Sequence, residues 1–463
     1  MRTFELLTIV ICLVYLVDYI YTKTSKKIIQ LTYVCITAIL VILHMFLEYY
    51  RWQMIPAYLM VVFLNITCIR SIVRPIKERK KTKLFAKIIC SVFTLVYAAI
   101  AILLPAILPV FSFDNPKPDY IIGSTSRHLI DASREDLPFS RSKRELMVQI
   151  WYPAEKSNNL KRMPYYPHPV MSEALAEMAG LPKFFFNNIN LVKTNSYLNV
   201  NPSNNSGKYP VILYSHGFGS NRFNNTFLVE ELVRHGYIVV GIDHTHYTST
   251  TVFPDERVTK VDVSEKSIIN NFNSEIQVWV EDAQFVINEL SRINREDPVF
   301  SGKFDLEKLG YFGHSVGGAT AQYAIMKDER IKAAINMDGY IPGYDAGSVG
   351  KPFMMMMHDP EMDNFKPGSD NDKMMLDYYD FIKTINDTAL DSTYLLQIKN
   401  SVHFSFTDSS ILTRMLFPTS IAPKRCFTII NSYTISFFDK FIKNEDNGLL
   451  NSPSSKYCEA ILK

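Results

Sequence analysis

Long apolar runs dominate the N-terminal part of the chain. They cover residues 4–21, 28–47, 54–73 and 88–111. Each run is close to the roughly 20 residues that a helix needs to cross the hydrocarbon core of a bilayer. No small-residue cleavage site of the kind that ends a secretory signal peptide follows the first run. The pattern therefore predicts a four-helix transmembrane domain in residues 1–113.

Basic residues are distributed unevenly among the loops between these runs. Lysine and arginine are concentrated in the first loop and in the third, which spans residues 70–87, whereas the middle loop has only Glu48 and Arg51 as charged residues. Basic loops of membrane proteins remain in the cytoplasm. This distribution predicts a multi-pass protein of the cell membrane, with the chain after Phe113 on the extracytoplasmic side.

After a short linker at residues 114–118, strand-like runs alternate with helical patterns. Such alternation, with continuous apolar strands, is typical of a mostly parallel sheet covered on both faces. We therefore expect an α/β fold, specifically an α/β-hydrolase catalytic domain, in residues 114–463, with its functional residues after the carboxyl ends of the strands. The strand-like runs are 146–152, 211–214, 237–242, 309–312, 333–337, 353–357 and 394–398, and the helical patterns are 226–235, 276–290 and 319–326.

A nucleophile motif lies between one of these strands and the next helix. Gly313-His314-Ser315-Val316-Gly317 has the strand, tight turn and helix context of a nucleophile elbow. Gly313 and Gly317 have no side chains, so the chain can reverse sharply there and present the hydroxyl of Ser315 to solvent. The motif predicts Ser315 as a catalytic nucleophile; the alternative is a glycine-rich turn that tolerates a serine.

A serine hydroxyl needs a general base, and the base needs a group that orients it. His403 follows the last strand-like run, in agreement with the order serine, acid, histidine along the chains of α/β-hydrolases. Asp338 and Asp359 each follow a strand-like run between Ser315 and His403. The spacing leaves both aspartates open as the orienting acid.

Backbone N–H groups are expected to form the oxyanion hole. Val316 directly follows the nucleophile and supplies one of them. The second is expected from Phe218, in the sequence Ser215-His216-Gly217-Phe218-Gly219 after the strand-like run 211–214, because the glycines let the backbone approach a substrate.

Composition excludes several other classes of function. The formal net charge is +3, and the basic excess lies in residues 1–113 while the remainder is mildly acidic, so no nucleic-acid partner is expected. No CxxC or HExxH spacing occurs, so we expect no metal and no cofactor. Cys426 and Cys458, the two cysteines outside the apolar runs, could pair in an oxidising compartment. The pattern leaves the oligomeric state open.

Six short motifs follow one another within residues 119–445. They are VQIWYP at 148–153, YSHGFG at 214–219, HGYIV at 235–239, GHSVGGAT at 313–320, NMDGY at 336–340 and SVH at 401–403. Together they resemble the plasma and type II intracellular platelet-activating-factor acetylhydrolases and their bacterial relatives. In that family the acid follows the sixth strand in a motif similar to Met337-Asp338-Gly339, so the resemblance favours Asp338 over Asp359.

The resemblance implies a calcium-independent serine esterase. Its substrates would be phospholipids with short or oxidised acyl groups at the sn-2 position, and the predicted helices would hold it in a lipid bilayer. The alternative is a general carboxylesterase or lipase that acts on non-phospholipid esters. Peptidase or acyltransferase chemistry on the same triad and a non-catalytic ligand-binding membrane protein or sensor are further alternatives.

Overall fold

The computed structural model describes residues 1–22, 26–73, 84–115, 121–136, 139–157, 160–205, 207–264, 271–339, 349–362, 380–385, 387, 390–414 and 420–463. Most of the basic loop 70–87 therefore lies outside the described residues. The chain forms two compact units. Met1–Phe111 and Phe184–Val192 make up a helical unit, and Ser112–Lys183 and Lys193–Lys463 make up an α/β unit.

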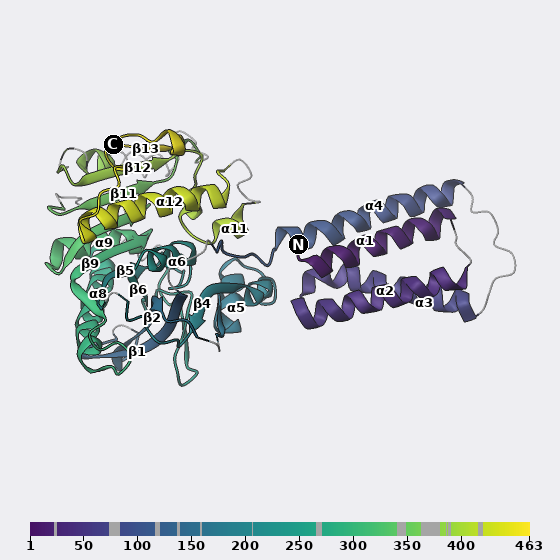
Figure 1. The fold of residues 1–463 in the computed structure, drawn as a ribbon, viewed down its shortest axis with the longest axis horizontal. Coiled ribbons are helices and arrows are strands. Elements are labelled where there is room, and N and C mark those ends of the chain that lie inside the picture. The colour runs from purple at the N-terminus through teal and green to yellow at the C-terminus, as the bar shows by residue number, and fades with distance from the viewer. Residues whose placement is uncertain are drawn as a thin grey trace. The chain divides into compact units, whose positions relative to one another are not determined.

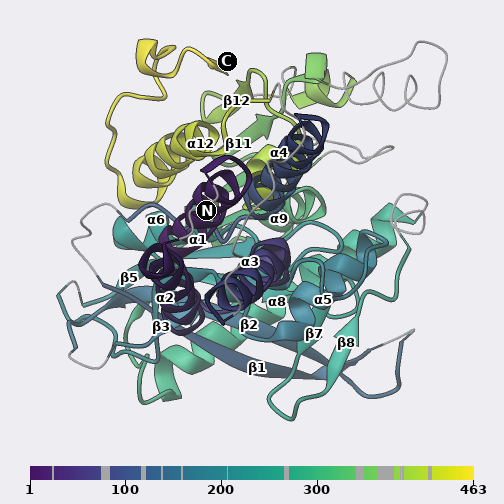
Figure 2. The ribbon, with the colours of Figure 1, turned by 90° about the vertical axis from the view of Figure 1, so that its right-hand side faces the viewer.

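Four apolar helices form the helical unit (Figure 1), and Figure 2 views them end-on. The segments Thr3–Tyr21, Lys27–Glu48, Trp52–Val73 and Leu84–Ile107 are long and apolar enough to cross a membrane. The last helix was expected over residues 88–111 but ends at Ile107, because Pro109 disfavours helical backbone at the preceding residue. The elements are α1 (Thr3–Val17), η1 (Asp18–Thr22), α2 (Lys27–Leu43), η2 (His44–Glu48), η3 (Trp52–Met54), α3 (Ile55–Val73) and α4 (Leu84–Ile107).

A buried ion pair between Arg51 and Glu5 lies at one end of this bundle. Arg51 donates two hydrogen bonds of 2.6 Å to the two carboxylate oxygens of Glu5, and a third of 2.6 Å to the carbonyl oxygen of Leu108. Both charged side chains are almost fully buried. The bidentate geometry and the added carbonyl acceptor compensate the two charges for the water they lose.

A short segment from the middle of the sequence packs on the same end of the bundle. Asn188 receives a hydrogen bond of 3.1 Å from Gln53 and donates one of 2.9 Å to the carbonyl oxygen of Pro109. The indole N–H of Trp52 donates to the carbonyl oxygen of Phe185 over 3.1 Å. These bonds explain why Phe184–Val192, which includes η4 (Asn187–Leu191), groups with the helices.

A mixed sheet of 11 strands organises the α/β unit, in the order β13-β12-β11-β10-β9-β5-β6-β2-β1-β4-β3. The neighbouring pairs from β12 to β6 are all parallel, and β2 pairs antiparallel with β1 and β6. The strands are β1 (Ile121–Glu135), β2 (Lys143–Ala154), β3 (Arg162–Pro164), β4 (Lys193–Leu198), β5 (Tyr209–Ser215), β6 (Ile238–Asp243), β9 (Phe304–His314), β10 (Ile331–Met337), β11 (Phe353–Met357), β12 (Thr393–Ile398) and β13 (Ala460–Leu462), with a separate hairpin of β7 (Thr250–Val252) and β8 (Val258–Lys260).

Helices cover both faces of this sheet (Figure 1). α8 and α9 pack together and contribute to the apolar cluster that contains Tyr311 of β9, whereas α6 and α12 pack together and Phe438 of α12 lies close to Gly310 on the opposite face. The structure thus confirms the expected α/β architecture. The remaining elements are α5 (Pro169–Met178), α6 (Thr226–Arg234), α8 (Phe272–Glu296), α9 (Val316–Lys327), η5 (Pro360–Met362), η6 (His403–Phe406), α11 (Ser410–Thr413), α12 (Pro423–Phe438), η7 (Asp439–Lys443) and η8 (Ser455–Tyr457).

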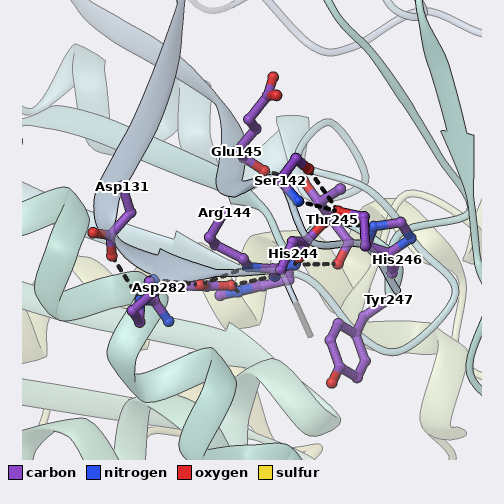
Figure 3. Close-up of polar contacts among 12 residues, drawn as sticks. Asp131, Ser142, Arg144, Glu145, His244, Thr245, His246, Tyr247 and Asp282 are labelled. Carbon is purple, nitrogen blue, oxygen red and sulfur yellow. Dashed lines mark hydrogen bonds and ion pairs between the residues drawn. The ribbon is translucent and has the colours of Figure 1, made fainter. Parts of the chain in front are cut away.

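A buried carboxylate ties α8 to the sheet. Asp282 of α8 accepts hydrogen bonds of 3.1 and 2.7 Å from Arg144 of β2, one of 2.8 Å from Arg134 and one of 3.0 Å from Nδ1–H of His244, the residue after β6 (Figure 3). Asp282 and His244 are fully buried, and Arg144 is nearly so. A carboxylate without such partners would be strongly destabilising at this depth.

Replacement of Asp282 by alanine leaves the Arg144 charge buried with only part of its compensation. We expect the Asp282→Ala protein to lose about 3–5 kcal/mol of the free energy of unfolding of the α/β unit. Denaturant titration followed by tryptophan fluorescence measures this loss, since Trp279 stacks on His244 at a ring-centroid distance of 4.0 Å. Asp255→Ala, which removes an exposed partner of Arg257, is the control and should cost less than about 1 kcal/mol. A loss of less than about 1 kcal/mol for Asp282→Ala would contradict the conclusion that Asp282 compensates the buried charge of Arg144.

Candidate active site

The turn between β9 and α9 holds Ser315 in a strained conformation. Its φ of 55° and ψ of −125° lie in a region that residues other than glycine rarely adopt. The N–H of Ser315 donates to the carbonyl oxygen of Met337 over 2.9 Å, which anchors the turn to the end of β10. The side chain remains partly exposed. This is the geometry of the nucleophile elbow that the sequence predicted.

The elbow glycines are required by close backbone contacts. A Cβ atom at Gly313 would overlap the carbonyl group of Gly317. A Cβ atom at Gly317 would overlap the carbonyl oxygens of Ser215, the last residue of β5, and of His216, the first residue of the loop that follows. Any larger residue at 317 would therefore separate this loop from the elbow.

Asp338 follows β10 in a tight turn. Its φ is 58°, and the side chain of Asn336 closes the turn by accepting the N–H of Gly339 at 2.8 Å and donating to the carbonyl oxygen of Gly339 at 2.9 Å. The N–H of Asp338 donates to Met356 of the adjacent strand β11. These bonds hold the buried carboxylate of Asp338 at the carboxyl edge of the sheet.

His403 and Asp338 form a hydrogen-bonded pair. His403 is the first residue of η6, and its Nδ1 lies 2.7 Å from Oδ2 of Asp338. An ionised carboxylate can only accept, so Nδ1 carries a proton, and in the neutral form of this imidazole Nε2 is the acceptor. The His403 side chain is 41% exposed while that of Asp338 is 2% exposed, so the pair points from the interior towards solvent.

Asp359, the second candidate acid, has a different role. Its Oδ2 accepts the N–H of Asn400 at 2.7 Å, and its Oδ1 accepts the N–H of Glu361 at 3.2 Å. The N–H of Asp359 donates to the carbonyl oxygen of Ser401. Asp359 thus fixes the loop before His403, and Asp338 is the aspartate that contacts the imidazole.

A second histidine binds the carboxylate of Asp338. His358 follows β11, and its Nδ1 lies 2.8 Å from both oxygens of Asp338, while its backbone N–H donates to Oδ1 over 3.0 Å. Burial by itself would raise the pKa of Asp338. The charge of His358 and the hydrogen bonds from His358 and His403 outweigh burial and hold this pKa well below its usual value. No sequence motif pointed to His358.

His314 contacts both the backbone and the ring of His403. Its Nε2–H donates to the carbonyl oxygen of His403 over 3.1 Å, and the two rings lie 4.5 Å apart between centroids. Burial, together with the nearby His403, lowers the pKa of His314 to about 3, so this imidazole is neutral at pH 7. The sequence placed His314 in the elbow turn and gave no signal of its contact with His403.

The loop after β5 presents a backbone N–H near the elbow. The carbonyl oxygen of Gly217 lies 2.7 Å from Nδ1 of His216 and also accepts the N–H of Ser220. Because the C=O and N–H groups of a trans peptide point in opposite directions, the N–H of Phe218 points away from these donors. A Cβ atom at Gly217 would lie 3.2 Å from Cβ of Ser315, which places this peptide beside the nucleophile turn.

Hydrogen bonds fix the ring of His216. A carbonyl oxygen cannot donate, so Nδ1 of His216 carries the proton given to Gly217, and Nε2 accepts the N–H of His244 at 3.3 Å and lies 2.9 Å from the hydroxyl oxygen of Thr248. Burial, followed by the nearby His244, lowers the pKa of His216 to about 3. The imidazole is therefore neutral and holds one tautomer.

The two expected oxyanion donors lie on adjoining segments. The side chain of Phe218 packs against the cluster that contains Val316 and Trp279. Within the described part of the chain, no hydrogen bond uses the backbone N–H of Phe218 or of Val316, and none joins the hydroxyl of Ser315 to His403. Catalytic hydrogen bonds are often absent or long in unliganded enzymes.

One cluster of potential metal ligands occurs in the described residues, and it lies in the helical unit. Glu5, His44 and Glu48 each offer an atom within 4.8 Å of the others. The Glu5 carboxylate is already bound by Arg51, and His44 lies 3.0 Å from Glu48 and 2.6 Å from the hydroxyl of Tyr58. The cluster is a network of ion pairs and hydrogen bonds whose ligand atoms are engaged.

The fold is that of an esterase of the α/β-hydrolase superfamily, and Ser315, Asp338 and His403 follow its strands β9, β10 and β12. A solved ferulic acid esterase from Streptomyces cinnamoneus matches with a TM-score of 0.59 and 25% identity, over 76% of this chain and 99% of that one. The family described as "Platelet-activating factor acetylhydrolase, isoform II" matches residues 119–295 and 298–456, and the chain belongs to this family.

Two similar proteins carry names that match this family. The platelet-activating factor acetylhydrolase of Cavia porcellus is 22% identical over 346 residues, which are 67% of this chain and 76% of the relative. A probable 1-alkyl-2-acetylglycerophosphocholine esterase of Arthroderma benhamiae is 24% identical over 275 residues, 54% of this chain and 65% of the relative. These matches agree with the resemblance seen in the sequence motifs.

The neutral, buried His216 predicts a pH dependence of stability. Its pKa is about 3 in the fold and about 6.5 in an unfolded chain, so below pH 6.5 the unfolded state binds more protons and is favoured. Relative to His216→Gln, which does not titrate, the wild-type free energy of unfolding should fall by about 1.4 kcal/mol per pH unit between pH 6 and pH 4.

Denaturant titrations of both proteins at pH 7, 6, 5 and 4 measure this difference. His235→Gln, which changes an exposed histidine, serves as the control and should follow the wild-type profile. A wild-type minus His216→Gln difference that is independent of pH would show that the fold does not lower the pKa of His216.

Proposed function

We propose that this protein is a membrane-anchored serine esterase that cleaves short or oxidised sn-2 acyl esters of phospholipids through an acyl-enzyme. Ser315 is the nucleophile, His403 the general base and Asp338 the acid that orients the base. The backbone N–H groups of Phe218 and Val316 form the oxyanion hole. No cofactor or metal takes part in this chemistry.

The hydrogen bond of 2.7 Å between His403 and Asp338 is the observation that carries the proposal. In the neutral imidazole it places the proton on Nδ1, so that Nε2 is the nitrogen that can take up a proton, as a general base requires. The strained turn at Ser315, anchored to the residue before Asp338, supports the same assignment. A buried carboxylate with a strongly lowered pKa in contact with an exposed imidazole is typical of functional sites.

In the proposed mechanism, Nε2 of His403 takes the Ser315 proton as the hydroxyl oxygen attacks the ester carbonyl carbon. Asp338 stabilises the imidazolium, and the two backbone N–H groups stabilise the tetrahedral oxyanion. The imidazolium then protonates the leaving alcohol, and the acyl-enzyme forms. Water activated by His403 attacks the acyl group, and release of the acid restores Ser315.

The four apolar helices support a site of action at a bilayer. Their length suits membrane spans, and exposed aromatic side chains gather at one end of the bundle, as is typical of the membrane interface. Tyr49, Tyr50 and Phe184 are each more than half exposed there, beside Trp52. With the basic loops in the cytoplasm, this end and the catalytic chain would be extracytoplasmic.

A carboxylesterase acting on non-phospholipid esters is the second candidate. The ferulic acid esterase from Streptomyces cinnamoneus, which matches over 99% of its length, favours this alternative. Both candidates use the same triad and differ only in the alcohol and acyl groups that the site accepts. The relative turnover of phospholipids and of simple acyl esters separates the two candidates.

Ser315→Ala should abolish ester hydrolysis, because it removes the nucleophile and leaves only binding and the oxyanion hole. The assay compares detergent-solubilised wild-type and variant proteins on phospholipids with sn-2 acyl groups from acetyl to palmitoyl and on simple acyl esters. We expect wild-type turnover to be fastest with the short sn-2 chains. Turnover of simple esters alone would support the second candidate, and an active Ser315→Ala protein would end both.

Asp338→Asn and Asp359→Asn form a matched pair that tests the acid. Loss of the orienting carboxylate should lower kcat by about 10⁴-fold in Asp338→Asn, since the wrong imidazole tautomer is then favoured. Asp359→Asn keeps one of the two acceptor oxygens that hold the loop before His403 and should lower kcat by less than about 10-fold. Steady-state kinetics on a short acyl ester measure both effects. The reverse ranking would assign the role to Asp359.

A further inference from the structure

Asp338 contacts one more imidazole than an orienting acid requires. A Ser-His-Asp triad needs a single histidine on its carboxylate. Here His403 occupies Oδ2 at 2.7 Å, and His358 approaches both oxygens at 2.8 Å. The second imidazole belongs to none of the steps described above, so its presence needs a separate explanation.

The position of His358 is set by the sheet. β10 and β11 are parallel neighbours, with Met337 paired with Met356, so the residues after the two strands lie side by side. The backbone N–H of His358 donates to Oδ1 of Asp338 over 3.0 Å, and its Nδ1 lies 2.8 Å from the same oxygen. The side chain is 14% exposed. The backbone N–H and the imidazole of His358 therefore both bind the carboxylate of Asp338.

The two hydrogen-bond donors of His358 limit the rotation of the Asp338 carboxylate. Both donors of His358 lie within hydrogen-bonding distance of Oδ1, so rotation of the carboxylate would break at least one of these bonds. Oδ2 is then kept towards Nδ1–H of His403. Hydrogen bonds to a charged group are stronger than those between neutral groups, so this orientation is firmly held.

We propose that His358 is a positioning residue for the reaction proposed above. It fixes the carboxylate of Asp338 towards His403 and shares its negative charge, so that His403 serves as base at a lower pH than a triad with an unshared carboxylate would allow. This inference rests on the proposed function, because it concerns the same triad.

The direction of the effect follows from electrostatics. Asp338 favours the imidazolium form of His403, and donors on the same carboxylate weaken that attraction. Without the imidazole of His358, the carboxylate attracts the His403 proton more strongly, and the base becomes available only at higher pH. The acid limb of kcat/KM should then move to higher pH.

Few other titratable groups face this pair within the described residues. His314 lies against His403 and is held neutral by burial. Asp359 follows His358 directly, but its carboxylate accepts the N–H groups of Asn400 and Glu361. The experiment therefore leaves both groups unchanged and alters His358 alone.

The experiment measures kcat and kcat/KM for a short acyl ester, p-nitrophenyl acetate, between pH 5 and pH 9 with the detergent-solubilised full chain. His358→Ala should lower plateau kcat by about 10-fold and move the acid limb of kcat/KM by about 0.5–1 pH unit to higher pH. His358→Asn retains an amide N–H near the position of Nδ1 and should recover most of plateau kcat. His235→Ala is the matched control at an exposed histidine.

The outcomes separate this inference from the proposed function. If Asp338→Asn is fully active, the triad itself is wrong. If Asp338→Asn is inactive but both His358 variants keep the wild-type plateau and acid limb, only the role of His358 is wrong. If His358→Ala has a lower melting temperature but an unmoved acid limb, His358 is a purely structural residue. If the acid limb of His358→Ala moves to lower pH, the proposed sharing of negative charge is wrong. If His358→Ala does not fold, His358→Asn decides by the same acid limb.

Discussion

The backbone of Gly317 lies directly against the carbonyl oxygens of Ser215 and His216, and the rest of the site depends on this contact. It joins the turn that carries Ser315 to the loop that carries Phe218. The parallel pairing of β5 with β9 places Ser215 opposite Gly313 and so aligns the two segments before they leave the sheet. The distance between the elbow and the neighbouring backbone N–H is therefore set by sheet register and by the absence of one side chain.

Buried carboxylates provide the second constraint on the α/β unit. Asp282 and Asp338 are both buried, both accept an imidazole Nδ1–H, and both have further donors that stabilise their charge. Arginines supply these donors to Asp282, and His358 supplies them to Asp338. In a low-dielectric interior such bonds are strong and leave little freedom of orientation. His244 after β6 and His403 after β12 are held by carboxylates of this kind, which is how a site can be preorganised before a ligand binds.

Much of the fold was predictable because it follows from local patterns. The four apolar helices, the central strands and the glycines around Ser315 leave signals within a few residues. The strand β1 was missed, since it is rich in polar residues and its pairing along β2 stabilises it more than its own composition does. The acid could not be chosen from spacing, because Asp338 and Asp359 occupy equivalent places after adjacent strands. The resemblance to a family favoured Asp338, and the side-chain directions in the fold bring this residue to His403.

The sequence by itself determined the order of the elements, the apolar helices, the elbow at Ser315 and a histidine after the last long strand, because backbone preferences and hydrophobic periodicity act over short distances. Only the tertiary structure decided that His314 holds the backbone of His403, that His216 orients the Gly217–Phe218 peptide and that His358 shares Asp338. Each of these depends on a donor and an acceptor whose relative directions arise from strand register and turn geometry, which no local pattern encodes.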